Sequence, residues 1–217
     1  MRSFRTPFGR RFLSGYQKGS LAYRYKELPC LKSPIDLAIY LRLLGTERPK
    51  TIFEVGSKAG GSALLFRDLA RLFQLDARIV SIDLSPPSIE DEDGIRFVRG
   101  DVLHLDEVFE REHLFPLERP WLVVEDSAHT RDGCLAALAF FADHLRAGEL
   151  IVIEDGVLSD LGLARRYGGG PNRAIAEFFE ARPGVFEIAT EYTDMFGRNA
   201  TYNPNGYLRR RAGDERS

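Results

Sequence analysis

The chain contains two similar stretches, WLVVED at residues 121–126 and LIVIED at residues 150–155. In each, four apolar and partly β-branched residues come directly before a Glu-Asp pair. Runs this short and this apolar are typical of buried strands in a parallel sheet. Because ligands of open α/β sheets bind just beyond the carboxyl ends of such strands, the two Glu-Asp pairs are expected at a ligand site.

Acidic side chains at such an edge destabilise the fold unless a cation compensates them. The simplest compensating cation is a divalent metal ion, which takes oxygen ligands and leaves room for a substrate oxygen. His129 follows Asp126 by three residues, where a proton acceptor is useful. The two stretches therefore predict a metal site with a histidine beside it.

Strands and helices alternate along the chain. Short apolar runs predict strands at residues 51–55, 78–82, 95–98, 121–124, 150–153 and 186–189, with a short last strand from residue 206. Apolar spacing predicts helices at residues 35–44, 63–73, 104–111, 132–144 and 172–180, and a loop near the acceptor site at residues 168–171. This alternation predicts an α/β fold with a doubly wound, mostly parallel sheet.

Composition excludes several classes of protein. The 217 residues suffice for one α/β domain with its own core, and a net charge of −2 gives no field that would favour nucleic acid. Cys30 and Cys134 form no CxxC pair, so a reducing cytoplasm is the expected location. No apolar run approaches the length that spans a bilayer.

The N-terminal segment has a distinct composition. Between Arg2 and Lys26 there are many basic and aromatic residues and no acid. We expect residues 1–30 to form an arm that packs on the domain or on a sister subunit, and it could also cover the active site as a lid. The aromatic arm is a hint of a homo-oligomer, a dimer or higher. The domain proper would then span residues 31–210, followed by a charged tail at 211–217.

A glycine turn follows the predicted strand at residues 51–55. Its spacing is Gly-x-x-x-Gly-Gly from Gly56, which differs from the GxGxxG pattern of dinucleotide folds. Glu54 precedes the turn and would repel a pyrophosphate but attract an ammonium group. S-adenosylmethionine, with a sulfonium and an α-ammonium, therefore fits better than NAD. The residues expected at this cofactor are Glu54, Gly56, Ser57, Lys58, Gly60, Gly61 and Ser62.

Three further acids belong to the predicted cofactor site. Asp83 ends the second predicted strand and is placed to accept from both ribose hydroxyls, and Asp101, after the third, from the adenine amino group. Glu125 is assigned to the same site. Any one of these acids could be a loop cap. Acids at the ends of successive strands make that interpretation less convincing for the whole set.

In these residues the chain resembles the cephalosporin hydroxylase / rhamnosyl O-methyltransferase family of class I S-adenosylmethionine-dependent methyltransferases. The resemblance covers about residues 31–208. Its marks are LKSPID at 31–36, EVG at 54–56 with GGS at 60–62, SID at 81–83, EDSAH at 125–129, VIED at 152–155, GP at 170–171 and NPNGYL at 203–208.

The resemblance implies a Rossmann-like, seven-stranded class I methyltransferase that methylates sugar hydroxyls with a bound magnesium ion. It further implies that Asp126, Glu154 and Asp155 hold the metal and that His129 is the catalytic base, acting with Asp126. The acceptor would be a small molecule or an oligosaccharide. Manganese could replace magnesium, because both accept carboxylate oxygens.

Three other functions remain open from the residues alone. A nicotinamide-dependent oxidoreductase conflicts with Glu54 and with the glycine spacing. A non-catalytic binding protein with a degenerate methyltransferase fold conflicts with the intact acids and His129. A metal-dependent hydrolase would leave the glycine turn, Asp83 and Asp101 without a role.

Overall fold

A computed structural model describes residues 2–88 and 94–212. Its main sheet has seven strands in the order β5-β4-β3-β6-β7-β9-β8. Their bounds are β3 (Thr51–Val55), β4 (Arg78–Asp83), β5 (Ile95–Arg99), β6 (Trp121–Glu125), β7 (Leu150–Ile153), β8 (Phe186–Ile188) and β9 (Tyr207–Arg210). β3 to β7 pair in parallel, and β9 runs antiparallel to both of its neighbours. The predicted doubly wound, mostly parallel sheet is confirmed.

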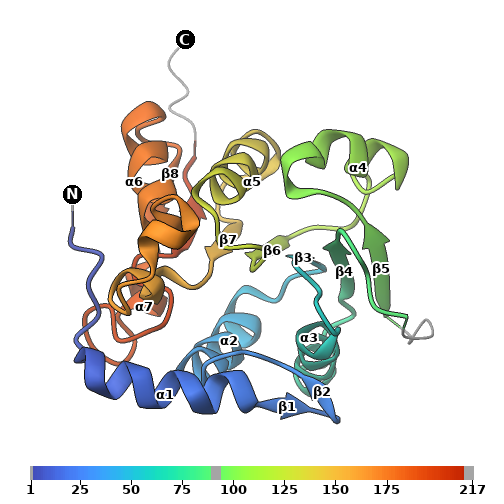
Figure 1. Ribbon diagram of the computed structural model, residues 1–217. Helices are drawn as coiled ribbons and strands as arrows, with labels where there is room; N and C mark the ends of the chain where they lie inside the picture. Colours follow the sequence, from blue (N-terminus) through green and yellow to red (C-terminus); the bar gives the residue numbers. More distant parts are fainter. Residues whose placement is uncertain (1, 89–93, 213–217) are drawn as a thin grey trace.

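Helices cover both faces of this sheet (Figure 1). α2 (Pro34–Glu47) and α3 (Gly61–Leu72) lie on one face, and α4 (Leu105–Arg111), α5 (Arg131–His144) and α6 (Gly170–Ala181) lie on the other. Side chains alternate along β3, so that Ile52 packs toward α2 and α3 while Phe53 packs toward α4 and α5. Burial on both faces explains why the central strands are apolar throughout.

Four helices, α2, α3, α5 and α6, begin one or two residues earlier than the sequence predicts. α2 begins at Pro34, after Ser33, whose hydroxyl accepts from the backbone N–H of Asp36 at 3.4 Å. α6 begins at Gly170 and includes Pro171, so the predicted loop at residues 168–171 is wrong in its last two positions. Proline suits a first turn because the N–H that it lacks has no partner within the helix there. The predicted helix at 104–111 forms α4, preceded by the 3₁₀ turn η1 (Val102–His104).

The N-terminal arm forms its own elements, which the sequence did not predict. They are α1 (Arg10–Ala22) and a hairpin of β1 (Arg24–Tyr25) and β2 (Leu28–Pro29). Within the domain, η2 (Gly156–Ser159), η3 (Ala164–Tyr167) and α7 (Thr190–Thr193) were also not predicted.

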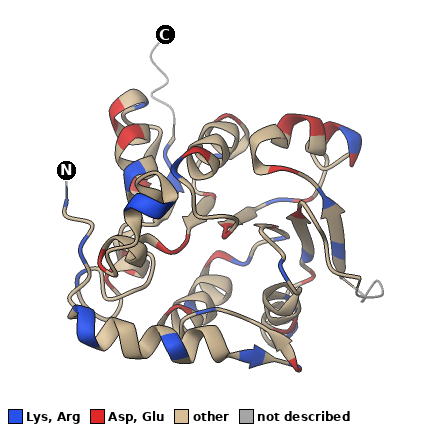
Figure 2. Cartoon of the chain, in the orientation of Figure 1, with Lys and Arg blue, Asp and Glu red and all other residues tan. Residues whose placement is uncertain are grey.

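α1 lies against the domain of its own chain. It carries Lys and Arg but no acid (Figure 2), and its Leu13 is fully buried against Val157, Leu158 and Tyr202. Of the predicted tail at 211–217, residues 213–217 lie outside the described residues. No helix among the described residues has the length and apolar character needed to cross a membrane.

Candidate active site

The glycine turn after β3 brings two parts of the predicted site together. Gly56 has a φ of 106°, and a Cβ there would lie 2.3 Å from the carbonyl oxygen of Asp126, just after β6. A Cβ on Gly61, at the start of α3, would lie 2.4 Å from the carbonyl oxygen of Pro29 in the arm. Only glycine permits both approaches. The turn therefore touches the acidic end of β6 on one side and the arm on the other.

Asp83, the last residue of β4, faces the same turn. Its carboxylate accepts from the backbone N–H groups of Ser57 at 2.9 Å and Lys58 at 3.0 Å. A third bond, of 2.8 Å, comes from the N–H of Ser85. Asp83 thus lies where a ribose ligand is expected, and it also fixes the path of the turn. The side chain of Lys58 is exposed.

Glu54 is completely buried in β3. Its Oε2 accepts from the hydroxyl of Ser81, which lies 2.6 Å from the hydroxyl of Ser57. Burial raises the pKa of Glu54, although the Lys32 ammonium and nearby serine hydroxyls act in the opposite direction. Within the described part of the chain, its Oε1 is buried and has no hydrogen-bond partner. An orphaned buried acceptor beside the glycine turn fits a ligand that donates, such as an ammonium group.

Two other predicted cofactor residues bind protein groups. Asp101 accepts from the backbone N–H of Leu103 at 3.0 Å and so caps η1. Glu125 is buried and accepts from Ser127 and, at 3.1 Å, from the thiol of Cys134 on α5. Burial raises the pKa of Glu125. Cofactor contacts by Asp101 and Glu125 therefore stay predictions.

The register between β6 and β7 decides which acids meet. Glu125 pairs with Ile153, and the N–H of Glu154 donates to the carbonyl of Glu125 at 3.0 Å. Glu154 is therefore level with Asp126. Because side chains alternate across a strand, these two acids point to the face opposite Glu125. The two similar stretches of sequence are thus offset by one residue in space.

Lys32, which the sequence argument did not single out, lies between these two acids. Its Nζ is 2.5 Å from Oδ2 of Asp126 and 2.6 Å from Oε2 of Glu154, and its side chain is only 2% exposed. Tyr40, from α2, donates to the other oxygen of Glu154. Only a general rule could have pointed to Lys32. A pair of buried acids needs a cation, and a lysine can supply it as well as a metal ion can.

The pKa values of this group depend on one another. Burial opposes the charge of Lys32, but the carboxylates of Asp126 and Glu154 raise its pKa well above the usual value. Burial and the neighbouring Asp126 raise the pKa of Glu154. The pKa of Asp126 is lowered: burial acts against this, but the Lys32 ammonium and His129 outweigh it. Of the two acids, Asp126 is therefore the one that stays ionised more readily.

His129 and Asp155 face each other across the strand ends. Both have left-handed backbone conformations, with φ of 55° and 59°. Nε2 of His129 lies 3.3 Å from Oδ2 of Asp155, and Nδ1 lies 3.8 Å from Oδ1 of Asp126. Asn203 accepts from the backbone N–H of Asp155 at 2.8 Å and so holds it in place. Strained backbone of this kind persists where the surroundings fix it, and it is frequent at functional sites.

The donor set of this group suits a divalent cation. Asp126, His129 and Asp155 each offer one ligand atom, and these atoms lie within 4.8 Å of one another. Their side chains are 21–29% exposed, so the group is reachable from solvent. Carboxylate oxygens are the ligands that magnesium and manganese prefer. Glu154 lies beside the group, but both of its oxygens are bound by Lys32 and Tyr40.

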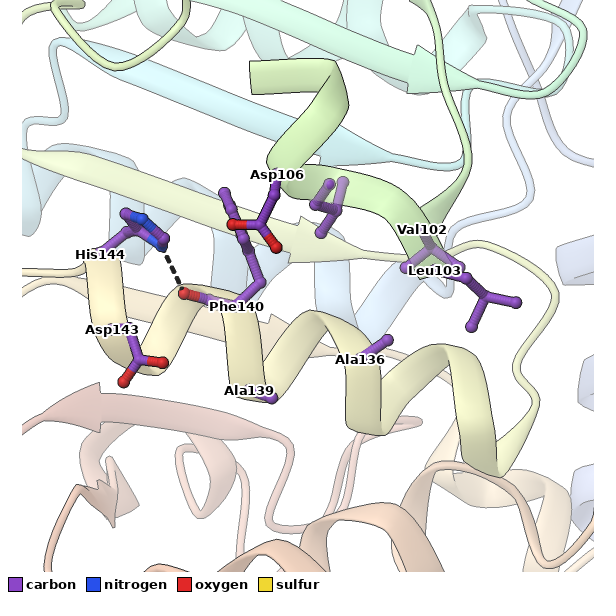
Figure 3. A pocket seen from close by; sticks show the side chains of 9 residues that line it. Val102, Leu103, Asp106, Ala136, Ala139, Phe140, Asp143 and His144 are labelled. Carbon is purple, nitrogen blue, oxygen red and sulfur yellow. Dashed lines mark hydrogen bonds between the residues drawn. The ribbon is translucent and has the colours of Figure 1, made fainter. Parts of the chain in front are cut away.

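A separate cavity of about 280 Å³ lies between η1, α4 and α5 (Figure 3). Nδ1 of His144 in this cavity lies 2.7 Å from the carbonyl oxygen of Phe140, so this histidine already has a partner. Asp143, also in the lining, forms an ion pair with Arg182. His144 and Asp143 of this lining are therefore already engaged by protein groups.

Comparison with known proteins shows what the chain is similar to. A family model described as rhamnosyl O-methyltransferase/CmcI matches residues 17–211. The rhamnosyl O-methyltransferase of Mycobacterium leprae (strain TN) is 28% identical over 192 residues, which are 85% of this chain and 81% of that protein.

Solved structures of CmcI are similar over most of the chain. The apo structure of CmcI-N160 has a TM-score of 0.69 and 31% identity, and the match covers 89% of this chain and 78% of that one. A structure described as cmcI-D160 Mg-SAM has a TM-score of 0.69 and 29% identity, with 88% and 78% covered. The chain therefore belongs to the rhamnosyl O-methyltransferase/CmcI family of methyltransferases.

Proposed function

We propose that this chain is an S-adenosylmethionine-dependent, divalent-metal-dependent O-methyltransferase that acts on a sugar hydroxyl. The observation that carries the proposal is the convergence of Asp126, His129 and Asp155 next to the glycine turn. Support also comes from the relative named a rhamnosyl O-methyltransferase and from the related structure described with magnesium and S-adenosylmethionine. The acceptor is a small molecule or an oligosaccharide.

The cofactor would lie along the glycine turn. Oε1 of Glu54 is the buried acceptor suited to the α-ammonium group, and Asp83 is suited to the ribose hydroxyls. Asp101 lies after β5, at the same edge of the sheet, and is assigned to the adenine amino group. Backbone N–H groups of Gly61 and Ser62, the first residues of α3, would provide further polar contacts.

The metal would be held by Asp126 and Asp155, with Glu154 beside them. When bound, a divalent ion lowers the pKa of a sugar hydroxyl that coordinates it and fixes that oxygen in position. Nε2 of His129 lies 3.3 Å from Oδ2 of Asp155, so we assign the imidazole proton to Nε2 and the lone pair to Nδ1. Among the described residues Nδ1 has no hydrogen-bond partner, and there His129 would accept the proton of the acceptor hydroxyl.

Calorimetric titration tests this proposal. The purified protein is titrated with S-adenosylmethionine and, separately, with NAD(P), each with magnesium and with EDTA. We expect micromolar binding of S-adenosylmethionine alone, followed by metal-dependent methyl transfer to members of a panel of mono- and oligosaccharides that includes rhamnosides. Binding of NAD(P) instead, or of neither cofactor, would contradict the proposal.

A further inference from the structure

The acidic cluster at the ends of β6 and β7 contains one buried cation of its own. Lys32 reaches two of the three acids, with its Nζ at 2.5 Å from Asp126 and 2.6 Å from Glu154. Asp155, the third acid, pairs with His129 on the more exposed side. The cluster therefore has an inner part neutralised by Lys32 and an outer part that faces solvent.

The backbone on both sides of Lys32 is tied to its surroundings. Lys32 lies between the arm hairpin and α2, where the N–H of Cys30 donates to the carbonyl of Tyr23 at 3.0 Å and Ser33 caps α2. Its Nζ also lies 5.9 Å from the ring centre of Phe66. With its side chain only 2% exposed, Lys32 places its ammonium inside the cluster.

The charge of Lys32 bears on how strongly the three acids can bind a divalent ion. A bound divalent ion favours the ionised form of the three carboxylates. Their three negative charges would then be balanced by one positive charge of Lys32 and two of the ion. In a site of low effective dielectric, a unit charge a few ångströms from an ion changes its binding strongly. A buried cation also prevents the unpaired acids from destabilising the fold.

We propose that Lys32 is a resident cation that lowers the affinity of the acidic cluster for divalent ions and keeps the cluster stable without one. The proposal rests on the metal dependence proposed above and adds a residue that tunes it. Lys32 is a positioning residue in this scheme, because it acts through Asp126 and Glu154 rather than on the substrate.

The test measures ion binding and needs no methyl transfer. Manganese and magnesium are titrated calorimetrically into the wild-type protein and into Lys32→Met, without cofactor or acceptor. We expect Lys32→Met to bind each ion on the order of tenfold more tightly or more. Lys32→Arg, which keeps the charge, should stay within about threefold of wild type. The melting temperature of Lys32→Met should fall in EDTA and recover with magnesium.

A matched control comes from the arm. Lys26 pairs with Asp68 at 2.7 Å away from the cluster and is half exposed, so Lys26→Met should leave ion affinity unchanged. Lys32→Gln is a second charge-removing variant that keeps an N–H donor, and it should also bind ions more tightly. If either variant folds only when a divalent ion is present, the ion replaces the missing charge and the inference is supported.

Three results would overturn the inference. The first is unchanged or weaker ion binding by Lys32→Met and Lys32→Gln, and the second is their failure to fold even with magnesium. The third, absence of divalent-ion binding in the wild type and in both variants, would also overturn the proposed metal dependence. Binding of S-adenosylmethionine, measured separately, distinguishes this third result from failure of the methyltransferase assignment.

Discussion

The two Glu-Asp pairs, Glu125-Asp126 and Glu154-Asp155, are alike in sequence and unlike in structure. β6 includes Glu125 as its last residue, whereas β7 ends at Ile153, before its glutamate. The glutamates therefore point to opposite faces of the sheet. Glu125 faces α5 and is bound by neutral groups, while Glu154 faces α2 and is bound by the ammonium of Lys32 and the phenol of Tyr40.

This difference shows that strand register, rather than local sequence, determines the face to which each acid points and therefore its partners. A shift of one residue moves a side chain to the other face of a sheet. The offset places Asp126 beside Glu154 and leaves Glu125 alone among uncharged partners. If this comparison holds, substitutions at equivalent positions of the two stretches must have different consequences.

The largest effect is expected at Asp126. Asp126→Asn removes a carboxylate from the metal group and a partner of Lys32, so ion binding and acceptor activation are lost together. We expect methyl transfer to fall by about 10⁴-fold or more, measured as turnover at saturating S-adenosylmethionine. Addition of excess magnesium should not restore it.

Glu125→Gln is the matched variant, one residue earlier in the chain. The amide oxygen can still accept from Ser127, and no charged partner is lost. Ion affinity should stay within about threefold of wild type, since Glu125 faces away from the metal group. Equal loss of ion affinity in Glu125→Gln and Asp126→Asn would break the comparison.

The next largest effect is expected at His129. His129→Ala should keep the affinity for S-adenosylmethionine within a few-fold, but lower turnover by about 10²–10⁴-fold, the usual contribution of a general base. His144→Ala is the control, because that histidine lies in the separate cavity and bonds Phe140. Turnover of His129→Ala at the wild-type rate would remove the base assignment.

The fold and the acidic end of the sheet could be predicted because they depend on local patterns. Buried strands are apolar on both faces, and the acids directly follow them. The arm helix α1 was missed because its apolar residues are sparse and it gains its stability from Leu13 packing on the domain. Lys32 was missed because its role depends on a contact across 94 residues of chain to Asp126, which no spacing rule reveals.

The smallest expected effect compares the two hydroxyls that bind the glutamates. Tyr40→Phe removes the phenol that donates to Oε1 of Glu154, and Ser127→Ala removes a hydroxyl that donates to Glu125. The backbone N–H of Ser127 still donates to the same oxygen at 3.3 Å, whereas Glu154 Oε1 loses its donor. We expect Tyr40→Phe to lower the free energy of unfolding by about 1.5–3 kcal/mol and Ser127→Ala by about 1 kcal/mol, measured by denaturant titration. A larger loss in Ser127→Ala would mean that Glu125, and not Glu154, is the more costly acid to bury.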